Sequence, residues 1–185
     1  RDADGAEIIA ICDQNAERLA LVGDQFSIAK RYRNAGEMLR TEKPDFVDIA
    51  TTAPSHRALV ELAASLGIAV ICQKPFATNL ADAKAMVAAC DKAGVALMVH
   101  ENFRWQSAIQ AVKQVLNAGT IGDVFWGRVS FRSNYDVYSG QPYLAEGKRF
   151  IVEDLGIHAL DIARFLFGDA INVSARIKRV NPKIK

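Results

Sequence analysis

The sequence predicts an α/β protein in which a doubly wound, Rossmann-like parallel sheet is followed by part of an α+β domain. Short apolar runs alternate with amphipathic stretches of helical period along residues 7–117. The apolar runs are nearly continuous and rich in β-branched residues, which is typical of strands that are buried on both faces. Repeated strand–helix units with short loops favour a parallel sheet covered by helices.

The expected elements of the first domain follow one another in regular alternation. Gly67, Gly94 and Gly119 each stand just beyond a helical stretch, where a left-handed residue commonly ends a helix. The predicted strands cover residues 7–12, 46–52, 68–72 and 95–100, and the predicted helices cover residues 16–26, 56–66, 80–93 and 108–117.

The pattern changes after Gly122, and we place a domain boundary near residues 119–122. Residues 123–133 alternate apolar and polar side chains, as a strand with one solvated face does. A polar and aromatic stretch, an apolar helix and a last strand are expected at residues 134–149, 155–166 and 170–180. We therefore expect an N-terminally incomplete α/β domain at 1–120 and the incomplete start of an α+β domain at 121–185.

Composition and charge exclude several classes of function. Half of the 185 residues are hydrophobic, and 23 basic against 21 acidic residues leave a formal net charge of +2. The basic runs at 30–33 and 178–185 are short and are interpreted as solvated surface, so no nucleic-acid partner is expected. No apolar stretch approaches the length of a membrane span, so no membrane partner is expected.

The three cysteines are interpreted as structural. Cys12, Cys72 and Cys90 have no metal-ligand spacing and lie in apolar or helical patterns. We expect reduced, buried thiols, no metal site and a cytoplasmic protein.

Asp13 is the first candidate for a ligand contact. It ends a predicted strand that leads into a helix, where dinucleotide folds carry an acid that binds the adenosine ribose hydroxyls. An aspartate there is equally suited to cap the helix, and both roles can hold at once. The glycine-rich fingerprint that should precede such an acid is absent, because only twelve residues come before Asp13. We expect the first, central strand and its glycine loop to be missing from the chain.

Two further loops follow predicted strands. In "TTAPSH", residues 51–56, small hydroxyl side chains and a proline can line a cofactor, although Pro54 and Ser55 are also ordinary residues for a helix start. In "CQKPFA", residues 72–77, Lys74 follows a buried strand and precedes a proline. Its ammonium can hydrogen-bond a substrate hydroxyl, whereas an unspecialised surface lysine is the alternative.

The segment "EDLGIHALD", residues 153–161, carries the acid–base candidates. Asp154 and His158 are four residues apart and share one face of a helix that reaches back to Asp154. Histidine is the usual general base near neutral pH, and a neighbouring carboxylate orients it. The alternative is a structural histidine beside an acid. Asp161 either supports this pair or lies in solvent.

Together these motifs resemble a known family. The order of "AICD", "ATTAPSH", "ICQKP", "HENFRW" and "DLGIHALD" is similar to the glucose–fructose oxidoreductase, inositol dehydrogenase and MocA group over nearly the whole chain. The resemblance implies a dinucleotide-binding Rossmann domain and a second domain with an open antiparallel sheet. It also implies a homo-oligomer that associates through this C-terminal sheet.

The resemblance carries roles to individual residues. Lys74 corresponds to the active-site lysine, His158 to the acid/base and Asp154 to its carboxylate partner. Asp13 corresponds to the ribose-binding acid, which favours NAD over NADP because it repels a 2′-phosphate. Gln73 departs from the usual glutamate, and it keeps a hydrogen-bonding group without the charge. The other implied cofactor contacts are Thr51, Thr52, Pro54, His56, Lys74, Asn102 and Arg104.

The predicted activity is hydride transfer between NAD(P) and a CH–OH group of a carbohydrate or polyol. His158, oriented by Asp154, takes the hydroxyl proton while Lys74 hydrogen-bonds the same oxygen. "HENFRWQ" and "YSGQPY" resemble a sugar-oxidising branch similar to apiose dehydrogenases. The expected substrate contacts are Lys74, Arg104, Tyr135, Tyr138, Asp154 and His158. An NAD-dependent glycoside hydrolase and a non-catalytic dinucleotide-binding regulator of the same family are the alternatives.

Overall fold

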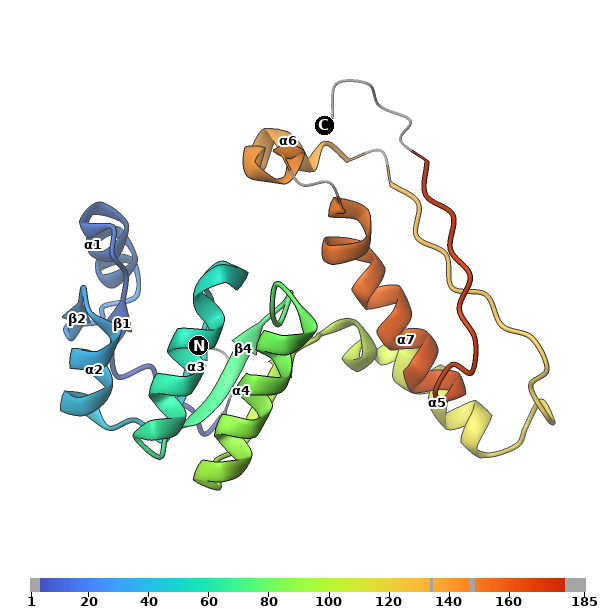
Figure 1. Ribbon diagram of the computed structural model, residues 1–185, viewed down its shortest axis with the longest axis horizontal. Coiled ribbons are helices and arrows are strands. Elements are labelled where there is room, and N and C mark those ends of the chain that lie inside the picture. Colours follow the sequence, from blue (N-terminus) through green and yellow to red (C-terminus); the bar gives the residue numbers. More distant parts are fainter. Residues whose placement is uncertain (1–3, 134, 147–148, 179–185) are drawn as a thin grey trace. The chain divides into compact units, whose positions relative to one another are not determined.

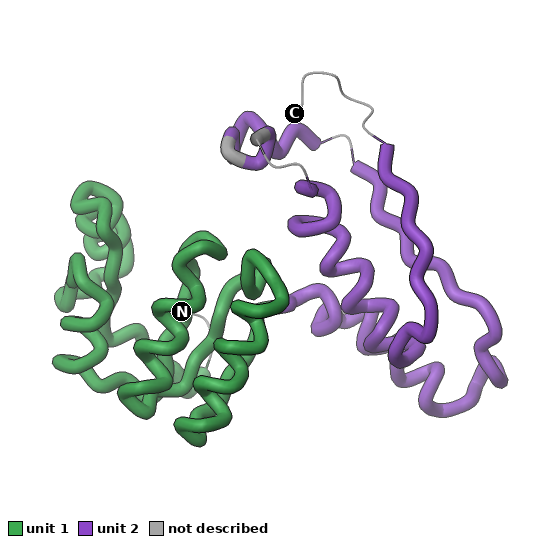
Figure 2. The backbone as a smooth tube through the Cα atoms, viewed as in Figure 1, with its two compact units in different colours: residues 1–100 green, residues 101–185 purple. Residues whose placement is uncertain are grey.

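The computed structural model describes residues 4–133, 135–146 and 149–178, and it forms two compact units. Unit 1 is Arg1–His100 and unit 2 is Glu101–Lys185 (Figure 2). This division lies before the boundary that the sequence predicts at 119–122. Helix α5 (Ser107–Asn117) packs against α7 (Ile157–Phe167), which places it with the second unit.

Unit 1 confirms the predicted alternation of strands and helices (Figure 1). One strand–helix pair, β2 and α2, is not predicted by the sequence, because its strand, Arg31–Tyr32, lies in a basic run and not in an apolar one. Its strand lies in the basic run at 30–33, whose basic residues Lys30, Arg31 and Arg33 are exposed, as the sequence predicts. The elements are β1 (Ile11–Cys12), α1 (Ala16–Gln25), β2 (Arg31–Tyr32), α2 (Ala35–Glu42), β3 (Phe46–Ile49), α3 (Ala53–Ser65), β4 (Ala69–Gln73), α4 (Leu80–Ala93) and β5 (Leu97–His100).

The strands of unit 1 form two separate parallel sheets. Strand β1 pairs with β2, and the other sheet has the order β3-β4-β5. No ladder joins β1 to β3 in the described residues. In a doubly wound sheet of the order 3-2-1-4-5-6, two such groups of strands lie on either side of a central strand.

Local sequence signals explain where the helices begin and end. Asn15, Asn34 and Asn79 cap α1, α2 and α4, each accepting a hydrogen bond from a backbone N–H three residues later. Gly94 ends α4 in the left-handed region at φ 66°. Asn15 is therefore the cap of α1, and Asp13 does not serve as one.

The core of unit 1 lies between its helices and the three-stranded sheet. Helix α3 packs against both α4 and β4, and Val60, Val70, Cys72, Met86 and Cys90 are almost completely buried. All three cysteines are free thiols, and burial raises the pKa of Cys72 to about 12. That thiol stays protonated near neutral pH, which agrees with a structural role.

All regular secondary structure in the described part of unit 2 is helical. It contains η1 (Phe103–Trp105), α5, α6 (Val137–Gly140), η2 (Pro142–Glu146), the π-helical turn η3 (Ile151–Gly156) and α7. The helix predicted at 155–166 is confirmed, although it is preceded directly by η3. The predicted strands at 123–133 and 170–180 are wrong for the described residues, which carry no strand there. A strand requires a hydrogen-bonded neighbour, and alternation alone does not supply one. Residues 179 and 180 lie outside the described residues.

No helix in the described ranges has the length and apolar character needed to cross a membrane.

Candidate functional site

The predicted ligand contacts of unit 1 follow the carboxyl ends of its parallel strands. Asp13 comes directly after β1, Thr51 comes shortly after β3, and Gln73 is the last residue of β4. Open α/β sheets bind their ligands at this edge. An acid, a hydroxyl and an amide at these positions are suitable partners for the ribose hydroxyls and amide of a dinucleotide.

Asp13 is held by an arginine on the first turn of the next helix. The two nitrogens Nε and Nη2 of Arg18 donate to the two carboxylate oxygens, the second at 2.9 Å. The backbone N–H of Asn15 donates to Oδ1 at 2.8 Å. The hydrogen bond from Arg18 lowers the pKa of Asp13. The carboxyl group therefore stays ionised at lower pH than an ordinary aspartate does.

The segment at residues 51–56 ends in a buried histidine that contacts two loops. His56 has no exposed surface, and its Nδ1 and Nε2 each lie 3.1 Å from a carbonyl oxygen, of Phe76 and Thr51 respectively. Ser55 donates its hydroxyl to Thr51 Oγ1 at 2.8 Å, and Pro54 lies in the first turn of α3. The geometry therefore makes His56 a link between two loops rather than a surface group.

His56→Leu is expected to lower the free energy of unfolding by about 1–3 kcal/mol, since leucine has no N–H to donate to a carbonyl oxygen of either loop. Urea denaturation of the variant and the unchanged protein measures this difference. His100→Leu is the matched control, because the His100 side chain is exposed. An equal effect of the two substitutions would contradict the anchoring role of His56.

Gln73 and Lys74 end β4 with a local hydrogen bond. Oε1 of Gln73 accepts from the backbone N–H of Lys74 at 2.8 Å, and its Nε2 lies 3.5 Å from Nδ1 of His100. The Lys74–Pro75 peptide bond is cis. The amide of Gln73 thus positions the backbone that carries the candidate lysine.

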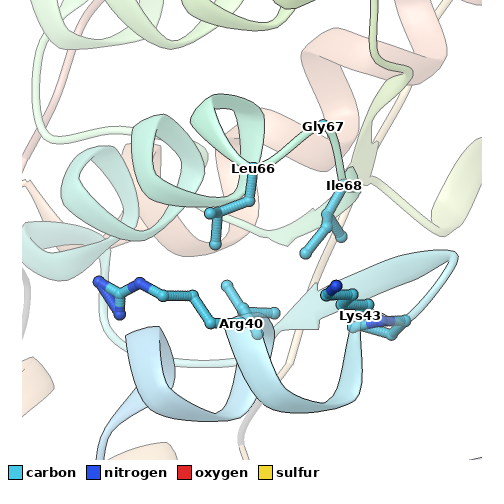
Figure 3. Close-up of a pocket in the computed structure, with 7 residues that line it drawn as sticks. Arg40, Lys43, Leu66, Gly67 and Ile68 are labelled. Atoms are coloured by element: carbon cyan, nitrogen blue, oxygen red, sulfur yellow. The ribbon is translucent and has the colours of Figure 1, made fainter.

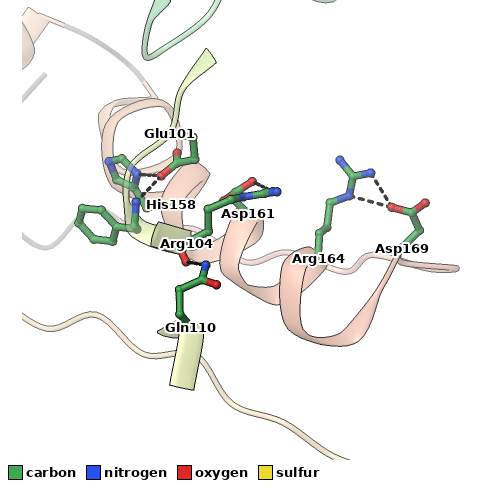
Figure 4. A network of polar contacts seen from close by, with 8 residues as sticks. Glu101, Arg104, Gln110, His158, Asp161, Arg164 and Asp169 are labelled. Carbon is green, nitrogen blue, oxygen red and sulfur yellow. Dashed lines mark hydrogen bonds and ion pairs between the residues drawn. The ribbon is translucent and has the colours of Figure 1, made fainter. Parts of the chain in front are cut away.

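His158 in unit 2 has a carboxylate partner that the sequence does not predict. Its Nδ1 lies 2.6 Å from Oε1 of Glu101, and both side chains are largely buried (Figure 4). The ring of Phe103 stacks on the imidazole, with centroids 4.0 Å apart and an interplanar angle of 9°. Glu101 belongs to the "HENFRW" motif, from which only Asn102 and Arg104 were expected to act.

The predicted partner, Asp154, lies in the π-helical turn η3, one helical element before His158. The sequence prediction assumes that Asp154 orients this histidine, yet the Nδ1 position is held by Glu101. Glu101 is therefore the carboxylate at Nδ1, and Asp154 as a further partner of His158 stays a prediction. Single π-helical turns are frequent at functional sites, so a role for Asp154 remains a prediction.

Arg104 is engaged within unit 2. Its Nε and Nη2 both donate to the carboxylate of Asp161, with Nε at 2.7 Å from Oδ2 (Figure 4). The guanidinium lies 5.3 Å from the ring centroid of Phe165. Nε2 of Gln110 donates to the carbonyl oxygen of Arg104 at 2.6 Å. Asp161 is therefore not simply solvated, since its side chain is 20% exposed and binds Arg104; support of the Asp154–His158 pair by Asp161 stays a prediction.

The remaining predicted contacts are more open. Asn102 is exposed and precedes η1. Tyr135 is 77% exposed, and Tyr138 is half-buried with its ring 5.4 Å from that of Phe150. Asn134 and residues 147–148 of the polar stretch lie outside the described residues.

A hollow of about 470 Å³ lies elsewhere in unit 1 (Figure 3). It is lined by the end of α2, including Arg40 and Lys43, and by residues 66–68, which follow α3. Strands β3 and β4 begin next to these segments, so the hollow is at the amino end of the sheet, opposite Thr51 and Gln73. We assign no chemistry to it, because ligands of such sheets bind at the carboxyl edge.

Comparison with known families agrees with this geometry. Residues 1–101 match the family described as "Oxidoreductase family, NAD-binding Rossmann fold", and residues 109–185 match the "GFO/IDH/MocA C-terminal domain". The chain belongs to the Gfo/Idh/MocA family of oxidoreductases. The predicted family and its Rossmann fold are therefore confirmed.

Two curated relatives match along the whole chain. The chain is 68% identical over 184 residues to D-apiose dehydrogenase of Paraburkholderia graminis, covering 100% of this chain and 49% of the relative. It is 64% identical over 185 residues to D-apiose dehydrogenase of Rhizobium rhizogenes, covering 100% and 54%. The chain spans about half the length of the curated relatives it matches.

A solved structure has nearly the same fold. An oxidoreductase from Agrobacterium radiobacter, in complex with NAD+, L-tartaric acid and magnesium, matches with a TM-score of 0.96 and 64% identity. The match covers 99% of this chain and 54% of the other. A probable dehydrogenase from Thermotoga maritima matches with a TM-score of 0.74 and 25% identity, covering 90% and 49%.

Proposed function

We propose that the protein containing this chain is an NAD-dependent dehydrogenase that oxidises a CH–OH group of a sugar, with D-apiose as the first substrate to test. The observation that carries the proposal is the identity of 64–68% with two D-apiose dehydrogenases along the whole chain. The buried His158–Glu101 pair supports it, because oxidation of a hydroxyl group requires a proton acceptor.

The residues at the carboxyl edge of unit 1 fit a dinucleotide. Asp13 offers two carboxylate oxygens to the ribose hydroxyls, and Thr51, Thr52 and Gln73 add hydroxyl and amide groups. NAD, when bound, accepts a hydride from the substrate carbon. The residues of this chain would hold the cofactor in position and set the charge around it.

Two side chains take the direct roles in this proposal. Nε2 of His158 accepts the proton of the substrate hydroxyl, and the Lys74 ammonium donates a hydrogen bond to a substrate oxygen. Arg104 acts by fixing η1 to α7 through Asp161. Contacts from Asn102, Tyr135, Tyr138 and Asp154 to substrate or cofactor complete the proposal.

The test is the formation of NADH by the full-length protein, followed by its absorbance with NAD+ and a panel of aldoses, cyclitols and polyols. We expect a rise with D-apiose or a related aldose. NAD+ binding without any rise across the panel would contradict the dehydrogenase. Release of a chromogenic aglycone without net NADH would then identify the hydrolase, and its absence would favour the regulator.

Cofactor choice follows from the Asp13–Arg18 pair. Asp13→Ala removes the charge that repels a 2′-phosphate and frees the Arg18 guanidinium, which is 64% exposed, to bind that phosphate. We expect the ratio of the Kd for NADP+ to the Kd for NAD+ to fall by about 10–100-fold, since hydrogen bonds to charged groups contribute about 1.5–3 kcal/mol. Isothermal titration calorimetry with each cofactor measures both constants.

The double variant Asp13→Ala, Arg18→Ala separates the two effects. It lacks both the repelling carboxylate and the guanidinium, so we expect weaker NAD+ binding and no gain of NADP+ affinity over the unchanged protein. Equal NADP+ affinity in the single and double variants would show that Arg18 takes no part.

We also propose that the protein acts in the cytoplasm as a homo-oligomer that associates through its C-terminal domain. Exposed apolar side chains in residues 123–133 and 170–178 support the association of subunits, among them Phe125 at 99% and Ile171 at 96%. Light scattering of the full-length protein on a sizing column tests it, and a monomer at micromolar concentration would overturn it.

A further inference from the structure

The ring of His158 in unit 2 is enclosed by a carboxylate and an aromatic ring that the proposed function does not yet use. His158 and Glu101 expose only 6% and 13% of their side chains, and Nδ1 lies 2.6 Å from Oε1. The same Oε1 accepts the backbone N–H of Phe103 at 3.1 Å. The carboxylate is therefore anchored to the same residue, Phe103, whose ring stacks on the imidazole.

The contact determines which ring nitrogen carries hydrogen. A carboxylate only accepts hydrogen bonds, so a contact of 2.6 Å requires the hydrogen of the imidazole on Nδ1. The neutral ring then has its lone pair on Nε2. Nε2 is the nitrogen that can accept a proton from a ligand.

We propose that Glu101 is a positioning residue that holds His158 in the Nδ1–H tautomer, with Phe103 holding the plane of the ring. This inference rests on the proposed dehydrogenase function. The substrate O–H bond breaks and its proton goes to Nε2, while the hydride of the substrate carbon passes to NAD+ with two electrons. Glu101 stays a carboxylate and stabilises the imidazolium that forms, as a buried acid does beside the histidine of a catalytic triad.

Neighbouring charges leave Glu101 available for this role. Arg104, three residues further along the chain, donates from Nε and Nη2 to the carboxylate of Asp161. The Arg104 ion pair therefore fixes η1 without competing for the glutamate. In the short segment from Glu101 to Arg104, the glutamate therefore contacts His158 and the arginine binds Asp161 on helix α7.

The test compares Glu101→Leu with Glu101→Asp in the full-length protein. Leucine removes the acceptor at nearly the same volume, whereas aspartate retains a carboxylate. We expect Glu101→Leu to lower kcat by about 10²-fold, within the range of general acid–base contributions, with little change in KM or in the Kd for NAD+. Glu101→Asp should restore part of the lost kcat.

Nitrogen-15 NMR of histidine supplies a readout that a purely structural role would not move. The His158 signals, assigned with a His158→Ala sample, should report the Nδ1–H tautomer in the unchanged protein and a mixture in Glu101→Leu. Glu101→Gln serves if the leucine variant does not fold, since its amide can also donate to Nδ1 and disturb the tautomer. Glu153→Leu is the control, because Glu153 is a half-exposed glutamate on η3 paired with Arg149, and both readouts should stay unchanged.

The outcomes separate this inference from the function on which it rests. Normal kcat and an unchanged tautomer in Glu101→Leu, with an inactive His158→Ala, would overturn the role of Glu101 alone. Full turnover in His158→Ala would instead overturn the acid–base assignment within the proposed function.

Discussion

His158→Ala is expected to lower kcat for sugar oxidation by about 10²–10⁴-fold, the usual contribution of a positioned general base. The variant loses the nitrogen that accepts the hydroxyl proton. The predicted contacts of the dinucleotide in unit 1 remain, so the Kd for NAD+ should change little. Steady-state NADH formation and calorimetric binding of NAD+ measure the two quantities.

Leu160→Ala is the matched control for this substitution. Leu160 lies on the same helix, α7, and is 55% exposed, so its truncation should leave kcat unchanged. Turnover of His158→Ala at the level of this control would remove His158 from the mechanism. A fall in both variants would indicate damage to the helix.

Lys74→Met is expected to lower kcat/KM by about 10²–10³-fold, as removal of one donor to a reacting oxygen does. Methionine retains the length and apolar stem of lysine but donates no hydrogen bond. The bond from the Lys74 backbone N–H to Gln73 does not involve the side chain, so the end of β4 should keep its form. The measurement is kcat/KM for the best sugar of the panel.

Lys84→Met provides the comparison, because Lys84 is an exposed lysine within helix α4. It should retain both activity and NAD+ affinity. An active Lys74→Met would show that Lys74 is an ordinary surface lysine, which is the alternative that its sequence context leaves open.

The sequence by itself determined the alternation of elements in unit 1 and the place of several candidate residues. Helix α4 was predicted with its observed ends, because its apolar period and Gly94 act within the helix itself. Lys74 was placed after a buried strand for the same reason. Such signals arise from residues near one another in the chain, so they can be recognised in the sequence without knowledge of the tertiary structure.

Only the tertiary structure decided which side chains meet. Glu101 and His158 are 57 residues apart, as are Arg104 and Asp161, and no local pattern connects the members of either pair. Sequence spacing favoured Asp154 because it lies four positions from His158. The pairing of His158 depends instead on the packing of η1 against α7, which buries both partners and gives their contact its strength. The predicted strands of unit 2 failed for the same physical reason, since a strand is made by a neighbour that the residues of the strand do not specify.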